Sequence, residues 1–330
     1  MSKRALKTSA ITGGGAGEPA DLDFARSLLA GLRAERKSIP CRFLYDRRGS
    51  ELFEQITRLA EYYPTRTETK ILRACAGDIR EATAPGSLLV EFGSGSSTKT
   101  EILLSALDRL KGYVAIDISP SALAEASSRL SGRFAGLTIY TVEGDFSRDL
   151  ELPGEFGTVP KIGFFPGSTI GNLVPDEAVH LLANMGRILG QGSRLIVGAD
   201  LRKDREVLLA AYNDAQGVTA AFNLNILARA NRDLNTKFDL SLFEHVASYD
   251  SERGRIDMNL VSRSDQVVRV LSHDIAFAKG EAIHTEHSHK YEIEGFQLLA
   301  QRAGWVPARV WTDADQLFSI HELHQPQAAD

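Results

Sequence analysis

The chain contains 330 residues, which is enough for one large domain or two modest ones. Its 43% hydrophobic and 25% charged residues are ordinary for a globular protein, and its net charge of −5 gives no basic footprint for nucleic acid. Two cysteines, Cys41 and Cys75, are too few for a disulfide framework, and no apolar run approaches the roughly 20 residues that cross a bilayer. We therefore expect a cytoplasmic protein without nucleic-acid or membrane partners. The absence of an apolar seam favours a monomer.

The first part of the chain combines a polar tail with helical segments. Residues 1–20 carry basic residues and a glycine run but no apolar core, so we expect a disordered tail rather than a signal peptide. Residues 21–36 have the spacing of an amphipathic helix. In the following stretch FLYDRRGSELFEQITRL, Ser50 is expected to cap another helix.

Between Leu88 and Leu201 the pattern changes to strands that alternate with helices. Apolar runs such as LLVEF, YVAIDI and KIGFF are separated by amphipathic stretches such as PSALAEASSRL. This alternation predicts a doubly wound, Rossmann-like parallel α/β sheet. It stops after Leu201, where residues 203–245 have helical spacing and residues 254–289 contain strands. The segment WVPARVWTDADQLFSIHEL predicts a closing antiparallel hairpin.

Three acidic residues stand at or near the ends of successive predicted strands. Glu91 directly precedes the turn Gly93-x-Gly95, Asp117 closes the next strand, and Asp145 follows in EGDFS. In open parallel sheets, ligands bind at the carboxyl ends of the strands. The pattern therefore indicates an adenosyl-type ligand across this edge of the sheet.

The glycine-rich turn favours S-adenosyl-L-methionine over NAD. The dinucleotide fingerprint requires a third glycine, and Thr98 occupies that position here. S-adenosyl-L-methionine has no pyrophosphate, so its partners differ. Gly93 suits its methionine end, Asp117 the ribose hydroxyls and Asp145 the adenine amino group, with Phe146 beside the adenine ring. The residues thus predict a methyltransferase.

Longer stretches resemble the histidine Nα-methyltransferases of ergothioneine biosynthesis. The matching stretches are FLYDRRGSELFEQITRLAEYYPTRTE (43–68), EFGSGSSTKT (91–100), GDF (144–146), FPGSTIGNL (165–173), AYNDAQGVTAAFNLNILARANRDL (211–234), FEHVASYD (243–250) and TEHSHKY (285–291). The resemblance covers roughly residues 24–320. It implies three methylations of the α-amine of L-histidine, through its mono- and dimethyl forms, to hercynine. S-adenosyl-L-methionine would be consumed and S-adenosyl-L-homocysteine released.

The resemblance also implies two domains. A class I methyltransferase domain would comprise residues 67–201 and 291–330. A smaller α+β substrate domain would comprise residues 21–66 and 202–290. The break in alternation after Leu201 is consistent with this division.

Carried over residue by residue, the resemblance assigns most of the site. The residues implied around the α-amine and carboxylate are Tyr62, Asn172 and Tyr212. The Asn172 amide can donate a hydrogen bond to the carboxylate and accept one from the amine. Tyr45 and Phe53 would form aromatic walls whose ring faces favour the growing cation. The expected catalytic residues are Tyr45, Asn172 and Tyr212. The further expected contacts are Gly167 and Met258 for the substrate and Lys99 for the cofactor.

Glu286 and Ser288 are the pair expected to recognise the imidazole ring. Residues two apart on a strand point to the same face, so both side chains can meet one ring. Glu286 would accept a hydrogen bond from one ring N–H, and Ser288 would pair with the other nitrogen. A side chain without those groups would leave a buried carboxylate unpaired, which is costly.

Three nearby histidines raise the question of a metal. On a regular strand, His284 faces opposite to His287 and His289, so the three would not converge and we expect no metal site. Methyl transfer from a sulfonium needs no metal, and no strong base is obligatory because the ammonium formed can lose its proton to water.

Two alternatives stay open from the residues. The first is an N-methyltransferase of another small amine, such as an indole amino acid. Glu286 and Ser288 argue against it, because an indole offers one donor and no acceptor. The second is an NAD-binding or non-catalytic Rossmann protein, which tight NAD binding without S-adenosyl-L-methionine binding would reveal.

Overall fold

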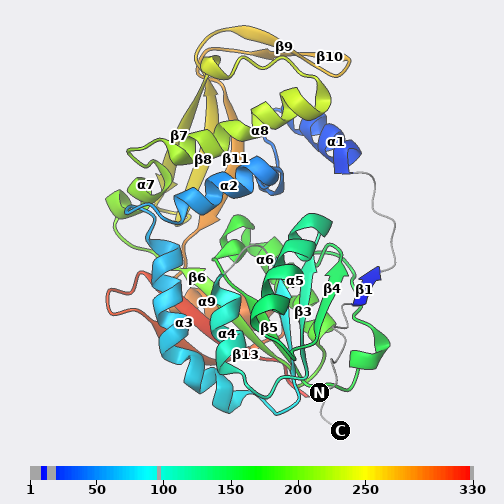
Figure 1. Cartoon of the computed structure of the whole chain (residues 1–330). Helices are drawn as coiled ribbons and strands as arrows, with labels where there is room; N and C mark the ends of the chain where they lie inside the picture. The colour runs from blue at the N-terminus through cyan, green and yellow to red at the C-terminus, as the bar shows by residue number, and fades with distance from the viewer. Residues whose placement is uncertain (1–8, 13–19, 95–97, 328–330) are drawn as a thin grey trace. The chain divides into compact units, whose positions relative to one another are not determined.

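The structure is a computed structural model that describes residues 9–12, 20–94 and 98–327. The chain forms two compact units (Figure 1). Unit 1 comprises Met1–Gly15, Arg66–Leu201 and Tyr291–Asp330, and unit 2 comprises Ala16–Thr65 and Arg202–Lys290. The cofactor and substrate roles expected of these two parts of the chain stay predictions.

Unit 1 is built on an eight-stranded sheet with the order β1-β4-β3-β2-β5-β6-β13-β12. The strands are β1 (Ser9–Thr12), β2 (Leu88–Phe92), β3 (Gly112–Asp117), β4 (Ile139–Glu143), β5 (Lys161–Phe165), β6 (Arg194–Asp200), β12 (Val306–Thr312) and β13 (Phe318–His324). Strands β1 to β6 pair in parallel, while β13 is antiparallel to β6 and to β12. The predicted doubly wound parallel sheet with a closing hairpin is therefore confirmed. The strand order reverses at β2, where such sheets bind ligands.

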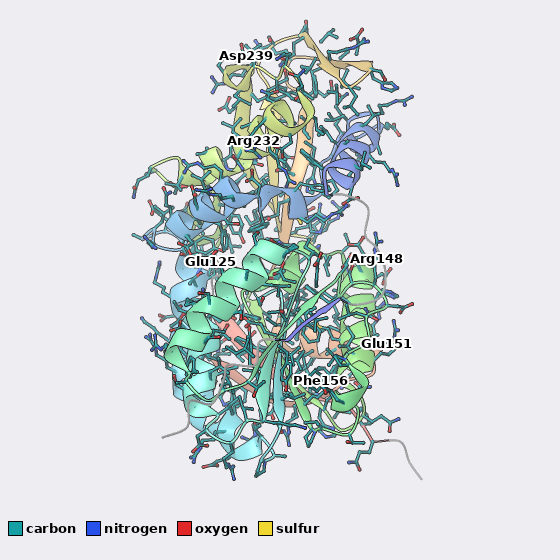
Figure 2. All side chains as sticks on the ribbon, turned by 45° about the vertical axis from the view of Figure 1, so that its right-hand side comes forward. Glu125, Arg148, Glu151, Phe156, Arg232 and Asp239 are labelled. Carbon is teal, nitrogen blue, oxygen red and sulfur yellow. The ribbon has the colours of Figure 1, made fainter. Side chains whose placement is uncertain are left out.

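Helices cover both faces of this sheet. They are α3 (Tyr63–Ala82), α4 (Thr98–Ala106), α5 (Pro120–Arg133), α6 (Pro175–Leu189) and α9 (Ile293–Arg302), with short 3₁₀ turns η2 (Gly154–Phe156) and η3 (Thr169–Asn172). Leu88 and Val90 pack with α6 and α9, whereas Leu89 between them packs with α3, α4 and α5. A strand that is buried on both faces has apolar residues at consecutive positions, which explains the apolar run in LLVEF. In Figure 2, Phe156 lies against the sheet, where its ring centroid is 4.8 Å from that of Tyr140.

The expected N-terminal tail contains a strand. Ser9–Thr12 form β1, which pairs in parallel with Tyr140–Glu143 of β4. For these four residues the expectation of disorder is wrong, because their backbone continues the hydrogen-bonded ladder at the open edge of β4. The rest of the expected tail, apart from Ala20 at the start of α1, lies outside the described residues.

Unit 2 combines helices with a three-stranded antiparallel sheet of order β11-β8-β7 and a separate hairpin. Its elements are α1 (Ala20–Leu32), η1 (Cys41–Leu44), α2 (Arg47–Ile56), α7 (Arg205–Tyr212), α8 (Val218–Leu234), η4 (Leu240–Leu242), β7 (Phe243–Asp250), β8 (Arg255–Ser262), β9 (Gln266–Val270), β10 (His273–Phe277) and β11 (Ala282–His289). In Figure 1, α2, α7 and α8 lie on one face of this sheet, and β9 and β10 form the hairpin.

The start of α2 differs from the expectation. Ser50 lies inside the helix, and Asp46 is its N-cap. The Asp46 carboxylate accepts a hydrogen bond from the Gly49 amide at 2.7 Å, which satisfies a backbone donor that the first turn leaves open. Over the described part of the chain, we find no helix that combines the length and apolarity needed to cross a membrane.

Candidate active site

The turn after β2 is built around Gly93. Its φ of 76° lies in the left-handed region, which glycine adopts without strain. A Cβ atom at this position would lie 3.9 Å from the Phe146 ring, so the bare backbone faces that ring. The Gly93 amide donates to the Ile116 carbonyl at 2.8 Å, which ties the turn to β3. Gly95, the second glycine of the predicted motif, lies outside the described residues.

Asp117 and Asp145 lie at the carboxyl ends of β3, the strand beside β2, and of β4, the next strand along the sheet. Asp117 ends β3, where burial raises the pKa of its carboxyl and the Ser119 amide, 2.9 Å from Oδ1, opposes that rise. Asp145 lies just beyond β4. Its Oδ1 accepts from the Ser147 amide at 2.9 Å, and its Oδ2 lies 3.3 Å from Arg148 Nε. Because β4, β3 and β2 are neighbours, both acids and the glycine turn share one edge of the sheet.

Phe146 is held by contacts from three elements. Its ring lies 5.7 Å from that of Phe92 and 6.0 Å from that of Phe165, measured between centroids. The side chain of Asn184 in α6 donates to the Phe146 carbonyl at 2.8 Å and also to the Arg148 carbonyl. Sequence reasoning missed Asn184, although an asparagine within HLLANMGRIL was a signal. Its amide fixes the loop that carries Phe146.

Lys99 and Gly167 both contact the carboxylate of Glu68, a residue that sequence reasoning missed. Lys99 Nζ forms a buried ion pair with Glu68 Oε2, and the Gly167 amide donates to Oε1 and Oε2 at 2.8 and 3.0 Å. Glu68 is 1% exposed. The signal was its position at the end of FLYDRRGSELFEQITRLAEYYPTRTE. Direct ligand contacts of Lys99 and Gly167 stay predictions.

Glu91 anchors α4 to the sheet. Both of its carboxylate oxygens lie 2.8 Å from Thr100 Oγ1, and the Tyr113 hydroxyl also donates to it. Burial raises the pKa of Glu91 to about 7, while the hydrogen bonds from Tyr113 and Thr100 oppose that rise. The acid before the turn thus supports the turn from inside unit 1.

Unit 2 contains five aromatic side chains that are linked by pairwise ring contacts, and we call them the aromatic cluster: Tyr45, Phe53, Tyr62, Tyr212 and Phe222. Ring centroids lie 5.5 Å apart for Tyr45 and Phe53, and 6.3 Å apart for Tyr62 and Tyr212. Tyr45 is the exposed member of the cluster, at 40% exposure, whereas Tyr62, Tyr212 and Phe222 are buried. Sequence reasoning missed Phe222, which lies on the buried face of α8.

Strand β11 directs Glu286 and Ser288 to one face of the sheet. In the register with β8, Glu286 stands opposite Met258 and Ser288 opposite Ile256, and all four side chains are buried. Burial raises the pKa of Glu286 to about 7, and the positive charge of Lys290 opposes that rise. The structure thus brings together three of the expected residues on two paired strands.

Lys290, directly after β11, is a further residue that sequence reasoning missed. Its Nζ donates to the Tyr212 hydroxyl and to Ser288 Oγ, both at 2.8 Å. The Tyr212 hydroxyl in turn donates to Ser288 Oγ at 2.9 Å. The position of Lys290 two residues after Ser288 in TEHSHKY was a signal, although a lysine after a strand is usually exposed to solvent.

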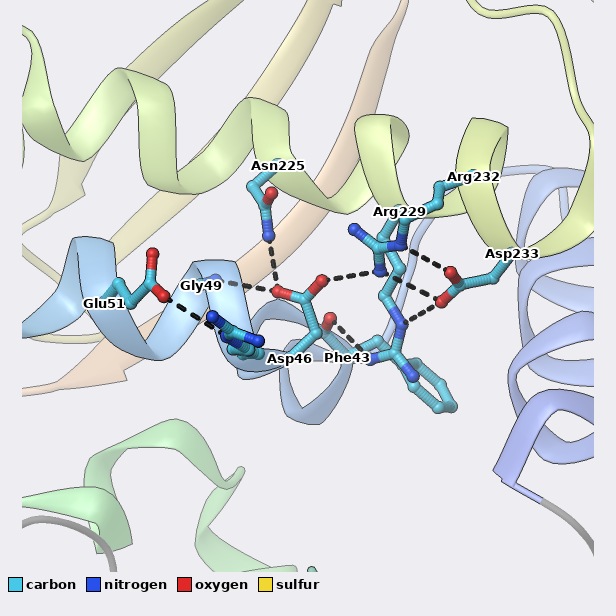
Figure 3. A network of polar contacts seen from close by, with 9 residues as sticks. Phe43, Asp46, Gly49, Glu51, Asn225, Arg229, Arg232 and Asp233 are labelled. Atoms are coloured by element: carbon cyan, nitrogen blue, oxygen red, sulfur yellow. Dashed lines mark hydrogen bonds and ion pairs between the residues drawn. The ribbon is translucent and has the colours of Figure 1, made fainter. Parts of the chain in front are cut away.

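Asp46 joins the start of α2 to α8 (Figure 3). Its Oδ1 accepts from Asn225 Nδ2 at 2.7 Å as well as from the Gly49 amide, and its Oδ2 lies 2.8 Å from Arg232 Nη2. These contacts fix the backbone next to Tyr45.

The expected residues divide between the units. Asn172 ends η3 in unit 1, whereas Tyr62 and Tyr212 belong to unit 2. The expected meeting of these three side chains around one amino acid stays a prediction.

The expectation that His284 faces away from His287 and His289 is wrong. A β-bulge at Thr285 shifts the register between His284 and Glu286, so the strand no longer alternates there. The His284 and His287 rings stack with centroids 5.6 Å apart, and the His287 and His289 centroids lie 5.3 Å apart. Within the described ranges, no group of three or more His, Cys, Asp or Glu side chains is arranged to hold a metal ion.

Comparison with known proteins decides the family. The sequence model of a family described as histidine-specific, SAM-dependent methyltransferase matches residues 24–325. The chain belongs to this family. It is 43% identical over 297 residues to a histidine N-alpha-methyltransferase of Mycolicibacterium smegmatis, covering 87% of this chain and 90% of that protein. It is 40% identical to a histidine N-alpha-methyltransferase of Mycobacterium tuberculosis, covering 88% and 92%.

As a histidine-specific methyltransferase family member, the chain is an enzyme that uses S-adenosyl-L-methionine as methyl donor. The alternative of an NAD-binding or non-catalytic Rossmann protein is therefore wrong, and the resemblance expected from the motifs is confirmed. A more distant relative, a 4-dimethylallyltryptophan N-methyltransferase of Claviceps purpurea, is 28% identical and covers 90% of this chain and 93% of that protein.

Proposed function

We propose that the chain trimethylates the α-amine of L-histidine to give hercynine, by methyl transfer to the neutral amine in three rounds. The single observation that carries the proposal is the arrangement of Glu286 and Ser288. These two polar groups lie on one face of β11, where Ser288 contacts the Tyr212 hydroxyl of the aromatic cluster. An acceptor and a hydroxyl at this spacing match the two nitrogens of a neutral imidazole.

The residues at the edge of the unit 1 sheet fit S-adenosyl-L-methionine. Gly93 leaves the backbone open to the Phe146 ring, and Asp117 is a half-buried carboxylate on the next strand. Gly93 would receive the methionine end, Asp117 the ribose hydroxyls, and Asp145 with Phe146 the adenine. When bound, the cofactor supplies a methyl group that is already activated by its sulfonium. No side chain therefore has to activate the leaving group.

The task left to the protein is to hold a neutral amine in line with the sulfur–carbon bond. Each round forms one N–C bond and breaks one S–C bond, and S-adenosyl-L-homocysteine leaves. After the first two rounds the ammonium releases a proton to water before the next transfer. An α-amine titrates near pH ~8 in peptides and higher in a free amino acid, so its deprotonated fraction has to be stabilised by hydrogen-bond acceptors.

We assign that role to Asn172 and to the hydroxyl groups of Tyr45 and Tyr212, with Tyr62 holding the amino-acid backbone. The Asn172 amide oxygen accepts from the amine, and its NH₂ group donates to the carboxylate. Phe53 and the other rings of the aromatic cluster favour the positive charge that persists after the third round. Met258, 2% exposed and opposite Glu286, packs against the imidazole side chain.

A second candidate function is N-methylation of a tryptophan-type amino acid, which the relationship to the Claviceps protein favours. An indole offers one N–H donor, which Glu286 can accept, but it has no acceptor for the Ser288 hydroxyl. The polar pair on β11 therefore favours histidine.

The decisive experiment is mass spectrometry of L-histidine and, separately, L-tryptophan after incubation with the purified protein and S-adenosyl-L-methionine. We expect histidine to gain three methyl groups on its α-nitrogen. Methylation of tryptophan at the rate of histidine, or no histidine product despite cofactor binding, would overturn the assignment of the substrate and leave the family intact.

A further inference from the structure

Lys290 is a buried cation in contact with residues assigned to the substrate. It is 2% exposed, and its backbone amide is fixed to the Gly254 carbonyl at 2.7 Å. Its Nζ lies 2.8 Å from Ser288 Oγ, 2.8 Å from the Tyr212 hydroxyl and 4.7 Å from the centroid of the Tyr212 ring. A buried ammonium is retained where its hydrogen bonds and charge are used, because its desolvation is costly.

The contacts of Lys290 fix the polarity of Ser288. An ammonium donates and never accepts, whereas a serine hydroxyl has one proton and two acceptor sites. Ser288 Oγ accepts from Lys290 Nζ and from the Tyr212 hydroxyl. With both acceptor sites used, the Ser288 proton is directed elsewhere, and Ser288 meets a ligand as a donor.

The charge of Lys290 acts on Glu286 as well. Glu286 is 7% exposed, and Lys290, directly after β11, is the charged group that acts on its ionisation. Glu286 in turn acts on the neighbouring Cys41 and Tyr45. The positive charge of Lys290 opposes the effect of burial, which favours the protonated acid. Lys290 therefore favours the ionised form of Glu286, which accepts hydrogen bonds with both carboxylate oxygens.

We propose that Lys290 is a specificity-determining positioning residue, which makes Ser288 a donor and Glu286 an acceptor, so that together they select a side chain with one ring N–H and one bare ring nitrogen. This assignment rests on the proposed function. A neutral imidazole meets both demands. An indole meets one of them, and a phenyl ring meets neither.

The test compares Lys290→Met, which removes the charge and all donors, with Lys290→Gln, which keeps a neutral donor. Binding of L-histidine and of L-phenylalanine is measured by calorimetry with saturating S-adenosyl-L-homocysteine from pH 6 to 9. Lys203→Met is the matched control, because Lys203 Nζ contacts Tyr63 in the same way, at 2.6 Å from its hydroxyl and 4.5 Å from its ring centroid.

In Lys290→Met we expect histidine affinity at pH 8 to fall about tenfold or more, because Ser288 and Glu286 are no longer held as a donor and an acceptor for the ring. Phenylalanine affinity should change less than about twofold, since that ligand makes no use of the polar pair. The fall in histidine binding toward acid pH should begin at higher pH in both Lys290 variants than in the wild type. Lys290→Gln should lose less affinity at pH 8, and Lys203→Met should keep the wild-type preference and pH profile.

Equal losses for histidine and phenylalanine, with no shift of the pH profile, would show that Lys290 is structural and overturn the proposal. If Lys290→Met lacks a cooperative melting transition, the binding of histidine and phenylalanine is compared in Lys290→Gln instead. Failure of the proposed function is recognised separately: the wild-type protein would then make no methylated histidine. Wild-type activity on histidine combined with unchanged preference in the variants would remove the Lys290 assignment alone.

Discussion

Glu68 of α3 occupies space that only a glycine at position 198 leaves open. A Cβ atom at Gly198 of β6 would lie 2.2 Å from Glu68 Oε1. The same carboxylate accepts from the Gly167 amide and pairs with Lys99. One buried acid thus fixes the loop after β5 and the first turn of α4, which follow the two strands where the sheet order reverses.

Gly198→Ala should therefore displace Glu68. We expect a loss of about 1–3 kcal/mol in unfolding free energy, as for other overpacked sites, together with weaker S-adenosyl-L-methionine binding. Denaturant melts and calorimetry measure both. The control is Gly77→Ala in α3, where a Cβ meets nothing within 4 Å and helix propensity predicts equal or greater stability. Wild-type stability in Gly198→Ala would contradict the account.

Asp117→Asn tests the cofactor site. If the carboxylate accepts from the ribose hydroxyls, its loss should weaken S-adenosyl-L-methionine binding about tenfold to a hundredfold. Asp149→Asn, which changes an aspartate with an 88% exposed side chain in the same unit, should leave the affinity unchanged. Equal affinities of the two variants for S-adenosyl-L-methionine would show that Asp117 is not part of the cofactor site.

Glu286→Gln tests histidine recognition. The amide keeps the shape of the side chain but loses the charge, so kcat/KM for histidine should fall about tenfold to a hundredfold. S-adenosyl-L-methionine binding should persist, because Glu286 belongs to unit 2. Glu252→Gln in the exposed turn before β8 is the control. Unimpaired turnover of histidine in Glu286→Gln would argue for a different imidazole partner.

Asp46→Ala should destabilise unit 2 by about 1–2 kcal/mol, because the helix cap and the links to Asn225 and Arg232 are lost together. Asp46→Asn is the matched variant, since asparagine caps helices as well as aspartate does but has no charge for Arg232. Urea unfolding should place Asp46→Asn between the wild type and Asp46→Ala. A lower stability of Asp46→Asn than of Asp46→Ala would show that the helix cap contributes little here.

His321 makes unit 1 sensitive to acid. Burial lowers the pKa of His321 from 6.5 to about 3. As pH falls below 6.5, the unfolded chain binds a proton that the folded chain does not, so stability is lost between about pH 6.5 and 3 and is fully present above 6.5. From pH 6.5 to 5 the wild type should lose about 2 kcal/mol more than His321→Gln. Parallel stability curves would show that His321 does not titrate in this way.

Much of unit 1 followed from short-range pattern. The apolar run LLVEF predicted a strand buried on both faces, and β2 packs Leu88 and Leu89 into opposite layers. The acids after β3 and β4 were placed correctly because a strand and the turn that follows it are coded by neighbouring residues. The register between paired strands could not be predicted from such local patterns. The bulge at Thr285 depends on how β11 pairs with β8, and it reversed the expected direction of His284.

Local periodicity thus determined the order of strands and helices, the doubly wound sheet and the acids at its edge, because these depend on residues close together in the chain. The folded chain alone revealed Glu68 between Lys99 and Gly167, Asn184 beneath Phe146, and Lys290 on Tyr212 and Ser288. Most of these partners are separated by 31 to 99 residues, as for Glu68 with Lys99 and with Gly167. A buried charge is stable only beside its partner, and that neighbourhood is created when distant segments pack together.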